Sequence, residues 1–286
     1  MNKLLFLALG AALGAGHGSA WAQALAANPM PDGSRDMYAG LGAQSAPRYE
    51  GSTSRKVSAL PVLQVQWSNG IFVSGMSGGM HLSDTPTLEY GPLLAVLPGR
   101  DESGTGNGLG GVDNFSTASP VDKSLLLLRS GRLGGMDEIG TRLQAGAFAN
   151  YYLTPQWRLT ASALYGSGRD RDGARLALGV QRLAADLGAR HRISVAAGLT
   201  LVNRNDNETY FGVTGDEAAR SVFSRYRPGG GLQDVHVGVR WNWAWTPAWM
   251  LTSSLQAKRL LGSAADSPLV ERPTHLTVSA AIAYRF

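Results

Sequence analysis

Cysteine is absent from the 286 residues of this chain, and so is any apolar run long enough to cross a membrane as a helix. Without cysteine the chain forms no disulfide and carries no lipid on an N-terminal cysteine, which excludes disulfide scaffolds and lipoproteins. A spanning helix needs about 20 consecutive apolar residues, whereas runs such as the leucines at 125–128 are short. Charged residues make up only 16%, with a net charge of +5, a mild balance that predicts no nucleic-acid partner.

The first 22 residues are predicted to be a secretory signal peptide. Lys3 precedes a short apolar stretch, and the small-residue site Ala20-Trp21-Ala22 predicts cleavage before Gln23. The mature chain is therefore expected to be exported, with 23–35 as a periplasmic N-terminal segment and 36–286 as a single domain.

The stretch VHVGVRWNWAW, residues 235–245, has two unlike faces. Successive side chains of a strand point to opposite sides of the sheet, so one face carries Val235, Val237, Val239, Trp241, Trp243 and Trp245. The other face carries His236, Arg240 and Asn242 among small residues. In a soluble domain a second apolar layer would have to cover the first face. The rest of the chain repeats the same one-sided alternation and offers no convincing long amphipathic helix to form that layer.

Lipid is the simplest solvent for these apolar faces. Eleven strand residues cover roughly 36 Å, or about 28 Å when tilted, and only closed barrels cross lipid in strands with every backbone group satisfied. In the opposite register Arg240 would lie in lipid at a cost of about 2–4 kcal/mol. The sequence therefore predicts an all-β protein, a transmembrane antiparallel up-and-down β-barrel in the bacterial outer membrane, in contact with lipid and lipopolysaccharide. An aromatic girdle is expected from Trp157, Trp241, Trp243, Trp245 and Trp249.

One motif occurs twice, as YYLTPQWRLT at 151–160 and as WAWTPAWMLT at 243–252. In both, an aromatic residue is followed by Thr-Pro-x-Trp-x-Leu-Thr. Proline presets the backbone of a tight turn, and flanking aromatic residues are typical of a membrane surface. Both turns are predicted to be periplasmic.

Alternating segments predict eleven strands, near 36–45, 57–67, 70–80, 87–98, 138–153, 157–168, 174–186, 192–204, 234–246, 249–260 and 273–286. Bacterial single-chain barrels have an even number. The best candidate for a twelfth strand is 123–132, in the largest unassigned gap, and ten strands remain an alternative.

The chain ends in HLTVSAAIAYRF, in which alternate residues are apolar and the last is aromatic. This ending resembles the signal that the barrel assembly machinery recognises. Tyr284 and Phe286 are its expected key residues.

Three patterns resemble catalytic motifs, and a structural interpretation is favoured for each. Residues 75–79 fit G-x-S-x-G, but that elbow requires a strand-to-helix turn, and residues 106–111 fit G-x-G-x-x-G without a crossover helix. His81 and Ser83 share a strand face, as in outer-membrane phospholipases, yet Asp84-Thr85-Pro86 indicates a turn. The other mature histidines, His191, His236 and His275, are isolated and lack metal-ligand spacing. We expect no enzyme activity, no cofactor and no metal.

Several motifs together resemble the MltA-interacting protein (MipA) / OmpV family. They are RYEGS at 48–52, Gly91-Pro92, Gly99-Arg100, LGGMDEIG at 133–140, YFGVT at 210–214 and RLLGSAADSPLV at 259–270. The resemblance covers essentially the whole mature chain. The family-motif residues singled out are Tyr49, Gly51, Ser52, Tyr210, Phe211, Gly212, Arg259, Leu260, Gly262, Asp266, Ser267 and Pro268.

The resemblance implies an outer-membrane scaffold that joins two peptidoglycan-remodelling enzymes, a lytic transglycosylase and a murein polymerase. It implies no catalytic residue. A scaffold would use the periplasmic parts, expected at 68–69, 154–156, 187–191 and 246–248, with 99–120 and 23–35 carrying most of the contact.

The alternatives are a small-solute porin-like channel or a surface adhesin. A channel would pass solutes through a basic lumen lined by Arg158, Arg192, Arg204, Arg240 and Asn242. Charged lumen residues are expected in any such barrel, so they favour a channel only weakly.

Overall fold

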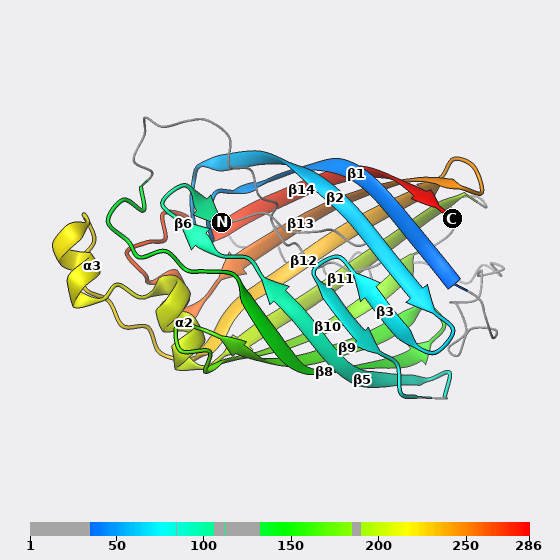
Figure 1. The fold of residues 1–286 in the computed structure, drawn as a ribbon, viewed down its shortest axis with the longest axis horizontal. Helices are drawn as coiled ribbons and strands as arrows, with labels where there is room; N and C mark the ends of the chain where they lie inside the picture. Colours follow the sequence, from blue (N-terminus) through cyan, green and yellow to red (C-terminus); the bar gives the residue numbers. More distant parts are fainter. Residues whose placement is uncertain (1–34, 84, 106–111, 113–131, 185–189) are drawn as a thin grey trace, which may run out of the picture.

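The computed structural model describes residues 35–83, 85–105, 112, 132–184 and 190–286, so the predicted signal peptide and most of 23–35 lie outside the described residues. The chain forms a closed antiparallel barrel in the order β1-β14-β13-β12-β11-β10-β9-β8-β5-β4-β3-β2 (Figure 1). The barrel strands are β1 (Arg35–Pro47), β2 (Arg55–Trp67), β3 (Ile71–Ser74), β4 (Ser77–Met80), β5 (Leu88–Leu97), β8 (Arg142–Thr154), β9 (Trp157–Ser167), β10 (Gly173–Ala184), β11 (His191–Val202), β12 (Gly231–Ala244), β13 (Trp249–Leu260) and β14 (Thr274–Arg285). The predicted up-and-down barrel is confirmed.

The two ends of the barrel differ in their connections. β1 begins and β14 ends at one end, on the right of Figure 1, where the chain turns briefly at 68–70, 81–87, 155–156 and 245–248. The opposite end carries the long connections 98–141, 203–230 and 261–273. Bacterial barrels have short periplasmic turns and longer extracellular loops, so the end with the termini of the barrel faces the periplasm.

The twelfth strand does not come from 123–132, which lies outside the described residues except for Arg132. β5 pairs directly with β8, from Leu88↔Tyr151 to Leu97↔Arg142, so the barrel closes without that segment. The extra strand arises because the single strand expected at 70–80 folds back as the hairpin β3–β4. Gly75 lies at its tip with φ +58°, a left-handed conformation that favours glycine.

The β3–β4 hairpin is short, and β2 pairs with β3 only over Gln64–Gln66. The Gly75 N–H donates to the Leu63 carbonyl, so the backbone groups of odd-numbered β2 residues point toward β3. Pro61 lies beyond the hairpin tip on this same edge. Because proline has no N–H, it fits an edge where, among the described residues, no strand pairs with β2.

The two predicted faces of β12 are confirmed. Arg240 and Asn242 are 6% and 9% exposed and point into the lumen, whereas Trp241 and Trp245 are 36% and 41% exposed on the outer wall. Other strands place buried polar side chains on the inner face in the same way: Gln44, Gln64, Gln144, Ser194, Thr252, Gln256 and Thr277. The barrel therefore has many polar side chains on its inner face and an apolar outer wall.

The smaller elements lie at the extracellular end. They are the hairpin β6 (Arg100–Asp101) and β7 (Gly104–Thr105) and the helices α2 (Arg204–Phe211), α3 (Gly215–Arg220) and α4 (Gly262–Ala265) (Figure 1). No helix in the described part of the chain is long and apolar enough to span a membrane.

Candidate functional site

The connections at the extracellular end pack on one another as a cap, defined here as the described residues of 48–54, 98–105, 132–141, 203–230 and 261–273. Its core is a cluster of buried apolar side chains drawn from four of these segments: Tyr49, Leu133, Met136, Val213, Phe223 and Leu269. A second cluster of Phe211, Leu260 and Ala264 joins the cap to the end of β13. Residues far apart in sequence thus form one apolar core over this end of the barrel.

Family-motif residues form many of the contacts within the cap. The Ser267 hydroxyl donates to the Phe211 carbonyl at 2.6 Å, which joins YFGVT to RLLGSAADSPLV. The Gly51 carbonyl accepts from the N–H groups of Glu271 and Arg272, both at 2.9 Å. Gly51 has φ +91°, and a Cβ there would lie 2.7 Å from the Val270 side chain. Glycine is therefore required where RYEGS contacts the other motif.

The remaining motif residues lie close by, with one exception. Arg100 donates to the Tyr210 carbonyl at 2.6 Å, and a Cβ on Gly212 would lie 2.2 Å from the Glu208 carbonyl oxygen. Around α4 are Leu260, Gly262, Asp266 and Pro268, with Asp266 at its C-cap. Ser52 is buried beside Thr53, whose N–H binds Glu271. Arg259 is exposed and pairs with the outward-facing Val235, so it lies on the outer wall.

A buried carboxylate ties the cap to the barrel wall. Asp206 of α2 is fully buried; it accepts from Ser167 at 2.6 Å and forms an ion pair with Arg175 of β10 at 3.2 Å. Gln233 at the start of β12 donates to it at 3.3 Å. Asn203 N-caps the helix by accepting from the Asp206 N–H at 3.0 Å, which satisfies a helix-terminal donor. Asp206 therefore fixes α2 to the wall through charge and hydrogen bonds together.

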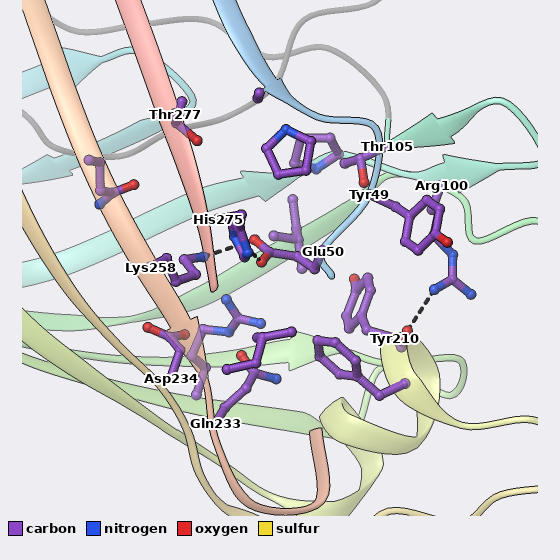
Figure 2. A pocket seen from close by; sticks show the side chains of 18 of the residues that line it. Tyr49, Glu50, Arg100, Thr105, Tyr210, Gln233, Asp234, Lys258, His275 and Thr277 are labelled. Atoms are coloured by element: carbon purple, nitrogen blue, oxygen red, sulfur yellow. Dashed lines mark hydrogen bonds and ion pairs between the residues drawn. The ribbon is translucent and has the colours of Figure 1, made fainter. Parts of the chain in front are cut away.

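Beneath the cap the lumen contains a cavity of about 160 Å³ (Figure 2). Its walls come from inward-facing strand residues and from the underside of the cap. Among the lining residues are Gln44, Tyr49, Glu50, Arg100, Arg175, Tyr210, Gln233, Asp234, Gln256, Lys258, His275 and Thr277. Because charged, amide, hydroxyl and phenol groups all face it, the cavity suits a polar occupant.

Charged side chains are paired around this cavity. Glu50 contacts the Lys258 ammonium at 2.8 Å and His275 Nε2 at 2.9 Å, as the dashed lines in Figure 2 show, while Asp234 contacts His236 at 3.0 Å. Burial alone would raise the pKa of Glu50, but the charge of Lys258 and the hydrogen bonds from His275 and Lys258 outweigh it and lower that pKa. Glu50 is therefore a carboxylate at neutral pH.

Further along the lumen, one described residue of the long connection 98–141 lies inside the barrel. Val112 is 2% exposed and packs on Leu60, Val62, Ala281 and Ala283. Its N–H donates to Gln64 of β2 at 2.8 Å, and its carbonyl accepts from Arg240 of β12 at 3.0 Å. Backbone from the extracellular side therefore binds two different parts of the inner wall.

The predicted girdle and assembly residues lie together at the periplasmic end. Trp241, Trp243 and Trp245 stack in sequence with ring centroids 6.1 and 5.5 Å apart. Trp249 meets Tyr284 edge-on at 5.0 Å, Tyr284 stacks with Phe286 at 6.3 Å, and Arg182 lies over Trp157 at 5.4 Å. Their roles in the membrane and in assembly remain predictions.

Two positional expectations were wrong. Residues 100–105 belong to the cap, where the Thr105 N–H donates to the Arg48 carbonyl, so this part of 99–120 is extracellular rather than periplasmic. Arg204 does not line the lumen, because it begins α2 and pairs with Glu208 at 2.7 Å on the cap surface. Both errors have one cause: long loops fold by packing on one another, which strand alternation does not predict.

The catalytic-looking patterns occupy structural positions where they are described. Residues 75–79 span the tip of β3–β4 with no helix after it, and 106–111 lie outside the described residues. His81 packs at a tilt against Phe72, with ring centroids 4.8 Å apart, and edge-on against the buried Phe148 at 5.3 Å, inside the barrel. A lipid-cleaving histidine would have to lie on the outer wall. Neither His81 Nδ1 nor the Ser83 hydroxyl has a hydrogen-bond partner among the described residues.

The charged cavity is not predicted by the sequence patterns. His275 is isolated in sequence but lies beside Glu50 in space, and Glu50 is the third residue of the motif RYEGS. One usable signal is the position of Lys258, since it lies on the same strand face as the inward-facing Gln256. A charged side chain that points into the lumen near the loop end of a strand, as Lys258 does, predicts an oppositely charged partner in one of the loops.

Comparison with protein families identifies a match to the model of the MltA-interacting protein MipA over residues 39–286. The chain belongs to the MipA family. The shared region includes the whole cap, the cavity lining and nearly all of the barrel. The protein is accordingly an outer-membrane β-barrel protein.

No curated protein matches the sequence. Among solved structures, the chain is similar to the NanC porin at 10% identity, covering 87% of this chain and 100% of that one, with a TM-score of 0.43. An outer membrane channel from Pseudomonas putida F1 gives 13% identity, 90% and 97% coverage and a TM-score of 0.34. The outer membrane protein OprD from Pseudomonas aeruginosa is 8% identical, with 86% of this chain and 65% of that one covered and a TM-score of 0.36.

Proposed function

We propose that this MipA-family barrel is an outer-membrane scaffold that holds peptidoglycan-remodelling enzymes, a lytic transglycosylase and a murein polymerase, at its periplasmic end. The description of the matched family as an interacting protein supports this role. One observation favours a scaffold over an open pore. Val112 binds both Gln64 and Arg240 across the lumen, and the cap covers the extracellular end above it.

The contact surface differs from the one expected from the sequence. A stable interface buries about 800 Å² per partner, from some 20–30 residues, and the tight turns are too small for this. With 100–105 on the extracellular side, the contact is proposed to lie on residues 23–34, expected from the sequence to be periplasmic, and on the turn 81–87. In that turn Leu82 is 50% exposed, so it offers an apolar contact.

The scaffold is tested by capture. Immobilised mature barrel should retain a purified lytic transglycosylase and a purified murein polymerase from the same bacterium. Replacing 23–34 by a neutral linker of equal length and Leu82 by serine should weaken retention at least about tenfold, which corresponds to a loss of about 1.4 kcal/mol of binding free energy. Arg204→Gln, at the opposite end, is the matched control.

A small-solute channel is the second candidate, favoured by the polar inner wall. It predicts single-channel conductance of the purified barrel in a planar bilayer. Steady conductance together with no enzyme capture by the wild type would replace the scaffold with the channel. An adhesin would instead lose surface binding when the cap is altered.

A further inference from the structure

Unpartnered polar atoms converge on the cavity beneath the cap. Among the described residues, nine buried side-chain nitrogen or oxygen atoms have no hydrogen-bond partner. Four of them belong to residues that line this one cavity: the hydroxyls of Tyr49 and Tyr210, Nδ1 of His275 and Nε of Arg175. Buried polar groups are nearly always hydrogen-bonded, and an unsatisfied one calls for an explanation such as an occupant. Since Tyr49 is 5% exposed and the His275 side chain 6%, bulk solvent does not provide the partners.

The charges around the cavity are balanced except at one position. Glu50 is paired with Lys258 and His275, Asp234 with His236, and Arg175 with Asp206. Arg100 is 6% exposed and makes a single side-chain hydrogen bond, to the Tyr210 carbonyl. Its side chain has no carboxylate partner among the described residues. A buried charge without a counter-ion is costly, and a carboxylate is the group that a guanidinium binds best, through two parallel hydrogen bonds.

The other lining groups are donors and acceptors suited to hydroxyls. The amides of Gln44 and Gln256 and the hydroxyl of Thr277 face the same space from the barrel wall. Burial raises the pKa of Tyr210 to about 12 and also raises the pKa of Tyr49, so both phenols remain protonated donors at neutral pH.

The size of the cavity limits the ligand. A dry, enclosed cavity of about 150 Å³ accommodates a ring of the size of benzene. This cavity is about 160 Å³ and is not fully enclosed, so a single ring bearing small polar substituents is the largest ligand that we expect it to take. We propose that it binds a small hydroxylated carboxylate, a sugar acid of a single ring, with Arg100 holding the carboxylate and the tyrosines and glutamines holding the hydroxyls. This proposal does not rest on the scaffold role, which concerns the opposite end of the barrel.

The probe for the test is D-glucuronate, titrated calorimetrically against the purified full-length mature barrel in detergent. We expect saturable binding within the millimolar range, with glucose and glucosamine at least about tenfold weaker because neither offers an anion to Arg100. Arg100→Gln should weaken glucuronate binding at least about tenfold. Arg272→Gln, an exposed arginine of the same cap, should leave it unchanged.

Arg100→Gln also removes the bond to Tyr210 and so affects the cap itself. Thr277→Val therefore provides a second test, because this substitution in the barrel wall removes the hydroxyl and leaves a side chain of the same shape. It should weaken glucuronate several-fold while the heat-modifiable gel mobility of the folded barrel stays that of the wild type. No glucuronate binding in the millimolar range, equal binding of glucose and glucuronate, or equal effects of Arg100→Gln and Arg272→Gln would overturn the proposal.

Discussion

At the extracellular end the connections are long and are held by a buried apolar core and by buried ion pairs, whereas at the periplasmic end the turns are held by local hydrogen bonds. Arg169, in the connection between β9 and β10, bridges two segments of the cap, through Glu217 at 2.6 Å and Asp137 at 3.1 Å. In the turns, a threonine hydroxyl accepts from backbone N–H groups two and three residues on. Loop length thus determines which contacts hold a connection in one conformation: long loops need contacts with distant residues, and short turns need only hydrogen bonds among their own residues.

The largest expected effect is in the cap, at Asp206. Asp206→Asn leaves Arg175, whose side chain is 25% exposed, without its counter-ion. Breaking a buried pair from one side costs about 3–5 kcal/mol, so a cost near the lower end of that range is expected here. We expect α2 to detach from the wall and 203–230 to become accessible to protease on intact cells. Asp216→Asn, an exposed carboxylate on α3, is the control. Equal protection in both variants would show that the cap does not depend on this ion pair.

The next largest effect is expected from charged substitutions in the barrel wall between the two ends. Val237→Arg places a charge in lipid near the middle of β12, at a cost of about 2–4 kcal/mol, and Trp243→Arg, nearer the interface, should cost less. Asn242→Arg points into the lumen and serves as the comparison. Assembled barrel is measured by heat-modifiable gel mobility and yield. Identical yields from the three variants would contradict the assignment of faces.

Acid should affect the cap before it affects the turns. Burial alone would raise the pKa of Glu50, but the charge of Lys258 outweighs it, so that pKa is lowered. Burial would likewise raise the pKa of Glu217, but the hydrogen bond from the Thr214 backbone N–H outweighs it and lowers that pKa. The Thr53 N–H lowers the pKa of Glu271. A carboxyl with a lowered pKa stabilises the fold above its unfolded value, about 4.3, and loses that contribution as pH falls toward its folded pKa.

Amide hydrogen exchange of the cap should therefore stay constant from neutral pH down to about pH 5, after correction for the intrinsic rate, and rise below about pH 4. The turn at 154–156, which depends on a hydroxyl, provides the internal control. Parallel changes in cap and turn would indicate general unfolding instead.

The smallest effect is expected in the turns. The Thr246 hydroxyl accepts from Ala248 and Trp249 at 3.3 and 3.0 Å, as Thr154 does from Gln156 and Trp157. Thr246→Ala should cost about 1 kcal/mol, and Thr246→Ser should restore the loss. The urea midpoint of the purified barrel measures both. A loss in Thr246→Ala as large as that in Asp206→Asn would remove the distinction between the two ends.

Much of the barrel could be predicted from the sequence because its determinants are local. Alternation in 235–245 determines which face of β12 meets lipid, since a one-residue shift would place Arg240 in the bilayer. The repeated Thr-Pro-x-Trp motif likewise predicts its own turn, because the threonine binds backbone only two and three residues away. The family motifs were also visible in the sequence, although their mutual contacts were not.

Only the tertiary structure decided the rest. The fold-back of 70–80 depends on Gly75 and on the neighbours β2 and β5, which periodicity cannot reveal because both halves of a hairpin alternate. The position of 100–105 depends on contacts with Arg48 and with Tyr210, which is 110 positions from Arg100. The pairing of Glu50 with Lys258 joins residues 208 positions apart. Such contacts form only when the closed wall brings loop ends together. Strand faces are thus determined by each segment's own residues and by lipid, whereas the cap and its cavity are determined by packing between distant segments.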